Sequence, residues 1–484
     1  MEQSQLIELI RVIKSEEKDY IIQFSTLPYF NQGRMRAQVI PLLEICLNHP
    51  WHLDDQKLDK RTVFEKIFPD QTFVEGKLEK VMVEAHKVVR ACLLTQRYFR
   101  EENTFHQWLD FSEFAREQGL DTRYHQTIGR LKKIQSESIY TDSQFFRRQF
   151  LLESSISNEE SIRNQLKGDL NLPNVLHTLE LDYYLNRLAL LNVFLLQQKV
   201  AHIEVPESIK MLIEECNVPI RYLEESPFLK ITHEIFVLMR KTYPSPSEVQ
   251  YLFDLLLLYE GEFDSKSLIE FYTQLRNLCI LTLSANFEQL EMDYMLHKLY
   301  KDNLERGYLH FEGKISRGRY WAVSSNAMRT KDFPWALEVI EKYKHEIRDE
   351  NETQDIYRLN LANYFFAVGR FSECLDNIAG TFSYVDYLLH AKRLELKALY
   401  ELRSDLLPYK LDAFKMFLSR TSQKLLSEAQ RQIHTDFANF LHQIVSSILG
   451  DPKRSELLTK RIQEKKQAAE WRWLLEKAKA LKDG

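Results

Sequence analysis

The sequence predicts an all-α fold built from successive pairs of helices, and three observations lead to it. The chain of 484 residues holds only 13 Gly and 13 Pro, well below the roughly 7% and 5% usual in globular proteins. Few residues are therefore suited to the tight turns that join short strands. The chain is also longer than one hydrophobic core normally organises, whereas an array of repeated units grows by adding units. Finally, apolar residues recur at helical spacing along most of the chain.

Composition and charge indicate a globular chain with no strong overall electrostatic field. Apolar residues make up 44% of the chain and charged residues 28%, and the net charge is −5. A net charge this small and negative does not draw a whole molecule to nucleic acid or to anionic lipid, although local patches can still do so. The longest apolar runs, "LALLNVFLL" and "LLLLY", are far shorter than the roughly 20 residues that span a bilayer. We expect no membrane insertion.

The cysteines indicate a reducing compartment. They are odd in number, lie far apart and form no CxxC pair, which argues against a disulfide framework and against a zinc knuckle. The amino terminus lacks a basic start followed by an unbroken apolar run. We expect a cytoplasmic protein with free thiols. The five residues are Cys46, Cys92, Cys216, Cys279 and Cys374.

One stretch shows the layout of a helical hairpin. In "IYRLNLANYFFAVGRFSECLDNIAGTF", residues 356–382, a helical apolar stripe stops at Gly369 and a second stripe begins at Phe371. Glycine can end a helix because it reaches positive φ without a Cβ clash. The small residues Ala362 and Cys374 would let the neighbouring helix approach closely. The segment predicts two helices joined by a short turn.

This pattern resembles a tetratricopeptide repeat, and it returns along the chain. Upstream, Lys331-Asp332-Phe333 stands where Gly369-Arg370-Phe371 stands, with Lys331 in place of the turn glycine. Downstream, Ala398 lies 36 residues after Ala362, and a longer, irregular turn is expected near Pro408. The resemblance covers roughly residues 320–420. It implies a helical-hairpin, tetratricopeptide-like solenoid that binds partners in a groove.

In such a solenoid the groove is lined by the first helix of each pair. We place these first helices at residues 317–330, 355–368 and 384–402. Polar residues that interrupt the apolar stripes are candidates for partner binding, namely Asn326, Arg329, Arg358, Asn363 and Arg393. Two further candidates, Arg317 and Arg319, belong to "ERGYLHFEGKISRGRYWAV", where basic residues alternate with aromatic ones. Such a patch can bind RNA, phosphorylated groups or acidic peptides, or it can be a loop whose aromatic rings pack beneath its cations.

The rest of the chain is expected to be helical as well. We divide it into an irregular amino-terminal helical domain (1–150), a region of irregular helical pairs (151–310), tetratricopeptide-like repeats (311–450) and a terminal capping helix (451–484). A capping box with Ser245 as N-cap and Glu248 three residues later marks one helix start. Two long helices are expected to join near residues 284–286. Stretches such as "LPYFNQGRMRAQVIPLLE" and "NLANYFFAVGRF" also resemble a group of uncharacterised bacterial helical-repeat proteins, a resemblance that implies a fold but no activity.

Two segments leave a functional alternative open. Residues 58–93 predict a short helix, a turn at Pro69-Asp70 and a longer helix with several basic residues. This order loosely resembles the start of a winged-helix DNA-binding domain, although interleaved glutamates suit a solvated helix face. The basic amphipathic segment 451–484 suits a helix that caps the array, and it also suits a helix that binds a membrane or a partner helix.

Catalytic and metal-binding motifs are not found. There is no HExxH, GxSxG, GxGxxG or phosphate-loop sequence. His49 and His52 have no cysteine or acidic pair at metal-ligand spacing and are expected in a loop beside Trp51. We expect no enzyme activity, no cofactor and no metal. The sequence predicts a non-catalytic scaffold that binds a protein or peptide, and the alternative is a nucleic-acid-binding regulator that uses its amino-terminal helices.

Overall fold

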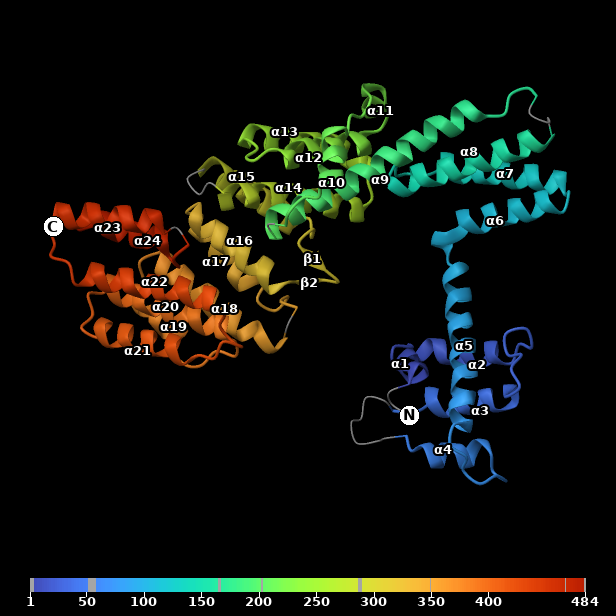
Figure 1. The fold of residues 1–484 in the computed structure, drawn as a ribbon, viewed down its shortest axis with the longest axis horizontal. Helices are drawn as coiled ribbons and strands as arrows, with labels where there is room; N and C mark the ends of the chain where they lie inside the picture. The colour runs from blue at the N-terminus through green and yellow to red at the C-terminus, as the bar shows by residue number, and fades with distance from the viewer. Residues whose placement is uncertain are drawn as a thin grey trace. The chain divides into compact units, whose positions relative to one another are not determined.

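The computed structural model describes residues 4–50, 58–163, 167–201, 203–285, 290–348, 350–465 and 467–482. These residues form 24 α-helices and one two-stranded β-hairpin, which confirms the all-α prediction (Figure 1). The chain divides into two compact units. Unit 1 comprises Met1–Ile139 and Gln144–Asp182, and unit 2 comprises Tyr140–Ser143 and Tyr183–Gly484.

Unit 1 contains the first eight helices and the beginning of the ninth. They are α1 (Gln5–Arg11), α2 (Lys18–Ser25), α3 (Arg36–Leu47), α4 (Lys60–Ile67), α5 (Lys77–Tyr98), α6 (Thr104–Glu117), α7 (Asp121–Ser136), α8 (Ser143–Arg163) and α9 (Leu172–Ala201). The core of its first half lies around α5, which packs against α1, α2 and α3. The buried positions of α5 recur every three or four residues from Leu78 to Cys92, which is the stripe that turns one helix face toward a core.

The helix, turn and longer helix predicted over residues 58–93 are confirmed as α4 and α5. Asp59 caps α4, because its carboxylate accepts a hydrogen bond from the backbone N–H of Thr62 at 2.9 Å. No strand occurs among the residues of unit 1 that the structure describes. The flanking strands of a winged helix are therefore missing from this described region.

Unit 2 contains the remaining helices and the β-hairpin. In chain order they are α10 (Glu207–Glu214), α11 (Ile220–Glu225), α12 (Pro227–Arg240), α13 (Pro246–Tyr259), α14 (Ser265–Ala285), α15 (Leu290–Glu305), β1 (His310–Phe311), β2 (Lys314–Ile315), α16 (Arg317–Arg329), α17 (Phe333–Lys342), α18 (Glu350–Ala367), α19 (Phe371–Ile378), α20 (Val385–Glu401), α21 (Leu407–Arg420), α22 (Glu428–Val445), α23 (Pro452–Glu464) and α24 (Trp471–Ala480). The predicted capping box is confirmed, because Ser245 and Glu248 each bond the backbone N–H of the other at the start of α13.

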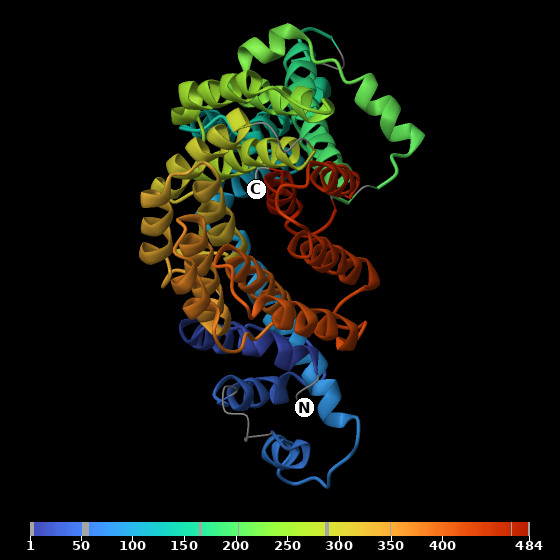
Figure 2. The same ribbon diagram turned by 90° about the vertical axis from the view of Figure 1, so that its left-hand side faces the viewer.

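The three predicted first helices correspond to α16, α18 and α20, and the second helices of the pairs are α17, α19 and α21. Each first helix packs against its own second helix, and α18 also packs against both α16 and α20. Figure 2 shows these yellow and orange helices next to one another. The exposed faces of α16, α18 and α20 therefore lie next to one another.

The turns inside the three pairs share one backbone geometry. Lys331, Gly369 and Arg403 all have positive φ, at 61°, 78° and 51°. In each turn the next residue donates its N–H to the carbonyl oxygen five residues earlier: Asp332 to Ala327, Arg370 to Phe365 and Ser404 to Leu399, at 2.8–3.0 Å. This is the Schellman ending of a helix.

The third turn is longer than the other two, as predicted, because residues 402–406 separate α20 from α21 whereas residues 330–332 and 368–370 form the other turns. The predicted break near Pro408 lies just before this residue, which occupies the first turn of α21, where a proline needs no N–H partner. The predicted irregularity is wrong at the start of the turn, because Arg403 adopts the same left-handed conformation as Gly369. The equivalent of Gly369 is therefore Arg403, 34 residues later.

Two further segments differ from their prediction. The single capping helix expected over residues 451–484 is two helices, α23 and α24, packed against each other. The basic and aromatic segment before α16 forms an antiparallel β-hairpin that pairs His310 with Ile315. Two residues of positive φ, Glu312 and Gly313, form its turn.

Trp51 and His52 lie outside the described residues, as do residues 286–289, which include the last residue of the joint predicted at 284–286 between α14 and α15. None of the helices described in either unit has the length and apolar character needed to cross a bilayer. None of the five cysteines forms a disulfide and all five are buried, and burial raises the pKa of Cys46, Cys279 and Cys374 to about 12.

Candidate functional site

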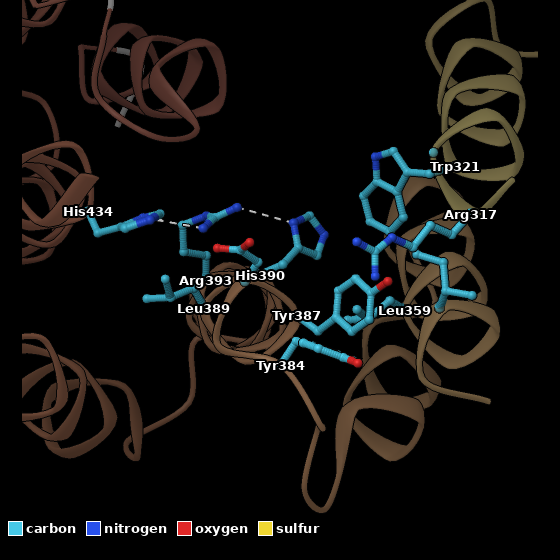
Figure 3. Close-up of a pocket in the computed structure, with 12 residues that line it drawn as sticks. Arg317, Trp321, Leu359, Tyr384, Tyr387, Leu389, His390, Arg393 and His434 are labelled. Carbon is cyan, nitrogen blue, oxygen red and sulfur yellow. Dashed lines mark hydrogen bonds between the residues drawn. The ribbon is translucent and has the colours of Figure 1, made fainter. Parts of the chain in front are cut away.

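A pocket of about 510 Å³ opens on the first helices of the three pairs (Figure 3). Residues of α16, α18 and α20 form most of its wall, and α22 completes it. The lining residues are Arg317, Gly318, Trp321, Ile356, Leu359, Tyr384, Asp386, Tyr387, Leu389, His390, Arg393 and His434. The pocket therefore lies on the surface where the repeat prediction places a groove.

One side of the pocket is aromatic. Trp321 projects from α16, and Tyr384 and Tyr387 point toward it from the start of α20 (Figure 3). The guanidinium carbon of Arg317 lies 5.9 Å and 6.0 Å from the centres of the two tyrosine rings, within the range of a cation–π interaction. Trp321 meets the ring of His390 edge to face, with 4.7 Å between the ring centres.

The other side is organised by Arg393. Its guanidinium lies 3.1 Å from Nδ1 of His390 and 3.2 Å from Nδ1 of His434. Arginine has only N–H donors, so both Nδ1 atoms must accept. Both imidazoles are therefore neutral, with their hydrogen on Nε2.

Asn363 fixes His390 from behind. Its side-chain nitrogen donates to the carbonyl oxygen of Leu359 at 2.8 Å. Nε2 of His390 lies 3.0 Å from this nitrogen and 3.2 Å from the side-chain oxygen of Asn363. Because Arg393 leaves the imidazole hydrogen on Nε2, the oxygen is the atom that accepts from it. A continuous chain of hydrogen bonds thus runs from α18 through α20 to α22.

The surroundings keep both imidazoles uncharged. Burial, with a further contribution from Arg393, lowers the pKa of His390 to about 3. The same two causes, in the same order, lower the pKa of His434 to about 4. A histidine in this state accepts a hydrogen bond at neutral pH but is a weak proton acceptor.

A carboxylate from the carboxy-terminal hairpin balances the charge of Arg393. Glu470, the residue before α24, receives Nε of Arg393 at 3.3 Å and Nζ of Lys397 at 2.8 Å. Burial alone would raise the pKa of Glu470, but Lys397 and Arg393 together hold it well below its usual value. Glu470 is therefore ionised and paired with two cations.

The structure brings three of the predicted partner-binding residues together. Arg317 and Arg393 line the pocket, and Asn363 stands directly behind it. Three others are engaged elsewhere. Arg319 donates to the carbonyl oxygen of Leu309, and Arg358 donates to backbone carbonyls at and after the end of α19. Arg329 forms an ion pair with Asp293 at 2.8 Å.

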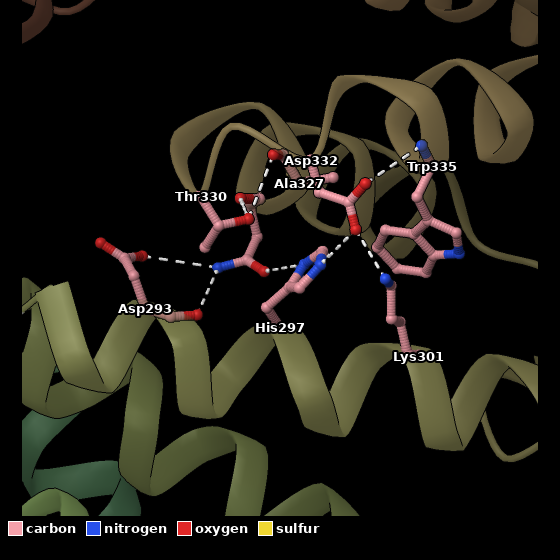
Figure 4. Close-up of polar contacts among 8 residues, drawn as sticks. Asp293, His297, Lys301, Ala327, Thr330, Asp332 and Trp335 are labelled. Carbon is pink, nitrogen blue, oxygen red and sulfur yellow. Dashed lines mark hydrogen bonds and ion pairs between the residues drawn. The ribbon is translucent and has the colours of Figure 1, made fainter.

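Asn326 does not line an exposed groove, because its side chain is fully buried. Its nitrogen donates to the backbone and the carboxylate of Asp293, and its oxygen lies 3.3 Å from Nδ1 of His297 (Figure 4). Nε2 of His297 lies 3.0 Å from the carboxylate of Asp332, which also pairs with Lys301. Asn326 therefore joins α15 to α16 inside the core. A polar residue that interrupts an apolar stripe can therefore be a buried hydrogen-bonding residue and not only an exposed one.

Sequence reasoning missed most of the pocket. His434 and Glu470 lie 41 and 77 positions after Arg393, and no local motif links residues so far apart. Tyr387, His390 and Arg393 follow one another at intervals of three on α20. This spacing places them on one helix face and was the signal that could have added Tyr387 and His390 to the predicted Arg393.

Several basic residues of the alternative interpretations make contacts within the chain. In the segment before α16, Arg306 pairs with Glu260 and Asp302, and Tyr308 stacks on Tyr272 with 5.4 Å between ring centres. On α5, Lys77 lies over the ring of Phe68 and Lys87 pairs with Glu84 at 3.1 Å. Within the described residues, no group of three or more histidine, cysteine or acidic side chains is arranged to hold a metal ion.

Comparison with protein families, with curated proteins and with solved structures finds no match to this chain. The tetratricopeptide resemblance and the resemblance to bacterial helical-repeat proteins therefore remain predictions, and the pocket itself is the evidence from which a function can be argued.

Proposed function

We propose that this protein is a non-catalytic scaffold that binds a segment of a partner protein in the pocket formed by α16, α18, α20 and α22. The observation that carries the proposal is the pocket of about 510 Å³, lined by the first helices of three successive pairs. A site of this size and lining suits a few side chains of an extended peptide. The partner is another protein, and the compartment is the cytoplasm, where buried free thiols persist.

The pocket is part of a tetratricopeptide-like solenoid in this proposal. In three successive helix pairs, the first helix ends at a residue in the left-handed conformation, and the next residue makes the same backbone hydrogen bond. Units that repeat one turn geometry stack with a regular offset, and such stacks present an extended binding surface. The shared turns at Lys331, Gly369 and Arg403 support this arrangement.

The lining indicates what the bound segment carries. The rings of Trp321, Tyr384 and Tyr387 suit an aromatic or long aliphatic side chain. Three of the five N–H groups of Arg393 are used by His390, His434 and Glu470, so two remain for an acceptor on the ligand. With Arg317 at the opposite side, the pocket favours a segment in which an acidic residue adjoins an apolar one.

A binding role suits this lining better than a catalytic one. The described lining residues include no cysteine, serine or threonine, so a thiol or an aliphatic hydroxyl nucleophile is not among them. The two histidines accept hydrogen bonds from Arg393, and their pKa values of about 3 and about 4 make them poor general bases near pH 7.

Affinity capture from native lysate tests the proposal. The wild type is compared with Arg317→Glu, which reverses a charge at the pocket, and with Lys424→Glu, which reverses one at an exposed residue outside the pocket lining. We expect a protein that is recovered after nuclease treatment, lost with Arg317→Glu and retained with Lys424→Glu. Recovery that depends on nucleic acid would support the regulator alternative instead, and a partner indifferent to Arg317→Glu would place binding elsewhere.

A further inference from the structure

The turn that leads into α24 has an unusual backbone and a central position. Glu470 has a φ of 54°, a left-handed conformation that glycine adopts freely and glutamate does not. Such strain persists only where surrounding contacts hold it. Here the contacts are those of the carboxylate with Arg393 and Lys397 on α20.

The same turn also touches α22. The backbone N–H of Ala469 donates to the carbonyl oxygen of Ile433 at 3.2 Å. The residue after Ile433 is His434, which lines the pocket. Two adjacent residues of this turn, Ala469 and Glu470, therefore hold the two helices that carry Arg393 and His434.

Further along, α24 is anchored to the carboxy-terminal end of α20. Nε1 of Trp473 donates to Glu401 at 2.8 Å, and Lys477 pairs with the same carboxylate at 2.8 Å. The ring of Trp473 meets that of Tyr400 edge to face. Since α23 and α24 pack against each other, the residues from Pro452 to Ala480 dock as one hairpin.

Arg393 is the residue that the pocket and this hairpin share. Its Nε faces Glu470, while its two Nη atoms face His434 and His390. An arginine fixed at all three nitrogens has one orientation. If the carboxylate of Glu470 left, the guanidinium could rotate, and both histidines would lose the donor that sets their tautomer.

We propose that docking of the α23–α24 hairpin assembles the pocket, with Glu470 as a positioning residue that acts through Arg393. The bound ligand then stabilises the docked hairpin, and the docked hairpin raises the affinity for the ligand, because coupling between two sites is reciprocal. The ligand part of this statement rests on the proposed function, whereas the effect of Glu470 on the empty pocket does not.

Fluorine NMR of the full-length protein labelled with 5-fluorotryptophan tests the effect on the empty pocket. Trp321 reports on the pocket because its ring contacts His390, and Trp473 reports on the hairpin. Their resonances are assigned with Trp321→Phe and Trp473→Phe. We expect Glu470→Gln, which keeps the size of the side chain and removes its charge, to shift both resonances.

Two variants separate positioning from simple destabilisation. Glu470→Gly removes the carboxylate and relieves the positive φ, so it folds without the backbone strain, yet it should shift the Trp321 resonance at least as far as Glu470→Gln does. Glu476→Ala removes an exposed carboxylate from the same helix and should leave Trp321 unchanged. A Trp321 resonance that stays in place in Glu470→Gly while that of Trp473 moves would overturn the proposal.

The ligand part is measured with a random peptide library selected on the wild type and counter-selected on Arg317→Glu. Peptides recovered in this way should bind Glu470→Gly at least tenfold more weakly and Glu476→Ala equally well. Equal affinity for wild type and Glu470→Gly would contradict the coupling. A library that yields no peptide dependent on Arg317 would count against the proposed function, and the fluorine spectra would then still decide whether the hairpin assembles the pocket.

Discussion

At the residue scale, arginine determines the state of its neighbours because it can only donate. Arg393 makes His390 and His434 acceptors, and Asn363 takes up the remaining hydrogen of His390. None of these four residues is informative alone, since each residue type occurs on many solvated helix faces. Their hydrogen-bonding roles are determined by contacts among α18, α20 and α22.

The two neutral histidines predict a pH dependence of stability. Their pKa values fall from 6.5 to about 3 and about 4 on folding, so between about pH 4 and 6.5 the unfolded chain binds more protons than the folded one. Stability therefore rises with pH across this window. Lowering the pH from 6.5 to 5 should cost about 1.5 kcal/mol per histidine, from the roughly 1.36 kcal/mol that corresponds to one pKa unit.

Urea unfolding of wild type, His434→Gln and His442→Gln at several pH values checks this expectation. In His434→Gln the amide oxygen of the new side chain would still accept from Arg393 but does not titrate, so this variant should show a shallower rise of stability with pH. The exposed His442 lies on the same helix, and its replacement should leave the slope near that of wild type. Equal slopes in all three proteins would refute the assignment.

Asn326 predicts a large effect of a small truncation. Asn326→Ala removes the partner of Nδ1 of His297 and one of the partners of Asp293 inside the core, and a buried polar group left without a partner costs about 1–3 kcal/mol. We expect a loss of about 2–3 kcal/mol in the free energy of unfolding. Arg329→Gln removes the more exposed partner of the same Asp293 and should cost less than about 1 kcal/mol. Similar losses in the two variants would mean that Asn326 is not a core link.

At the element scale, helical periodicity and caps were sufficient to predict much of unit 2. The first helices expected at 317–330, 355–368 and 384–402 agree closely with α16, α18 and α20. The greater length of the third turn was predicted, but its regular left-handed start was not, because the pattern looks for glycine while the backbone there uses Arg403 with positive φ. The backbone hydrogen bonds of the turn determine its geometry. Residues other than glycine can adopt the positive φ, at a cost in free energy.

The candidate site could be predicted only in part. Asn363 and Arg393 were identified because polar residues stand out on an amphipathic helix, and Arg317 because basic residues alternate with aromatic ones in its segment. His434 and Glu470 were not, because their partner lies on a different helix and the distance along the chain carries no information about contact in space. Asn326 looked the same as Asn363 in sequence, yet one is buried and the other stands behind the pocket.

The shared turn predicts opposite outcomes for two exchanges. A Cβ at Gly369 would meet no atom within 4 Å, so Gly369→Ala should suffer only from its positive φ, at about 1–2 kcal/mol. Lys331→Gly removes that strain at the matching position and should stabilise the protein by about 0.5–1 kcal/mol. This gain is smaller than the strain that is relieved, because glycine loses more chain entropy on folding than lysine does. Thermal unfolding measures both, and destabilisation by Lys331→Gly would show that the lysine side chain contributes more than its backbone costs.

At the scale of the whole molecule, the two units have separate cores. One core cluster of unit 1 extends along the sequence from Leu6 to Cys92, and one core cluster of unit 2 from Leu389 to Leu481. Units with their own cores unfold with a degree of independence. A single free energy of unfolding then describes each unit better than it describes the chain.

Matched core truncations test this independence. Phe64 in unit 1 and Phe437 in unit 2 are both fully buried, and Phe→Ala in a core costs about 3–5 kcal/mol. In calorimetry, Phe64→Ala should lower one transition and Phe437→Ala the other. One shared transition that moves by a similar amount in both variants would show that the units unfold together.

The five buried thiols can report on local opening of the native protein in both units. Cys46 and Cys92 belong to unit 1, while Cys216, Cys279 and Cys374 belong to unit 2. Burial raises the pKa of each thiol, so a maleimide reagent modifies a cysteine only after water reaches it. Mass spectrometry gives the order in which the five cysteines are labelled. This order is the order in which the surrounding parts of the native protein open to solvent.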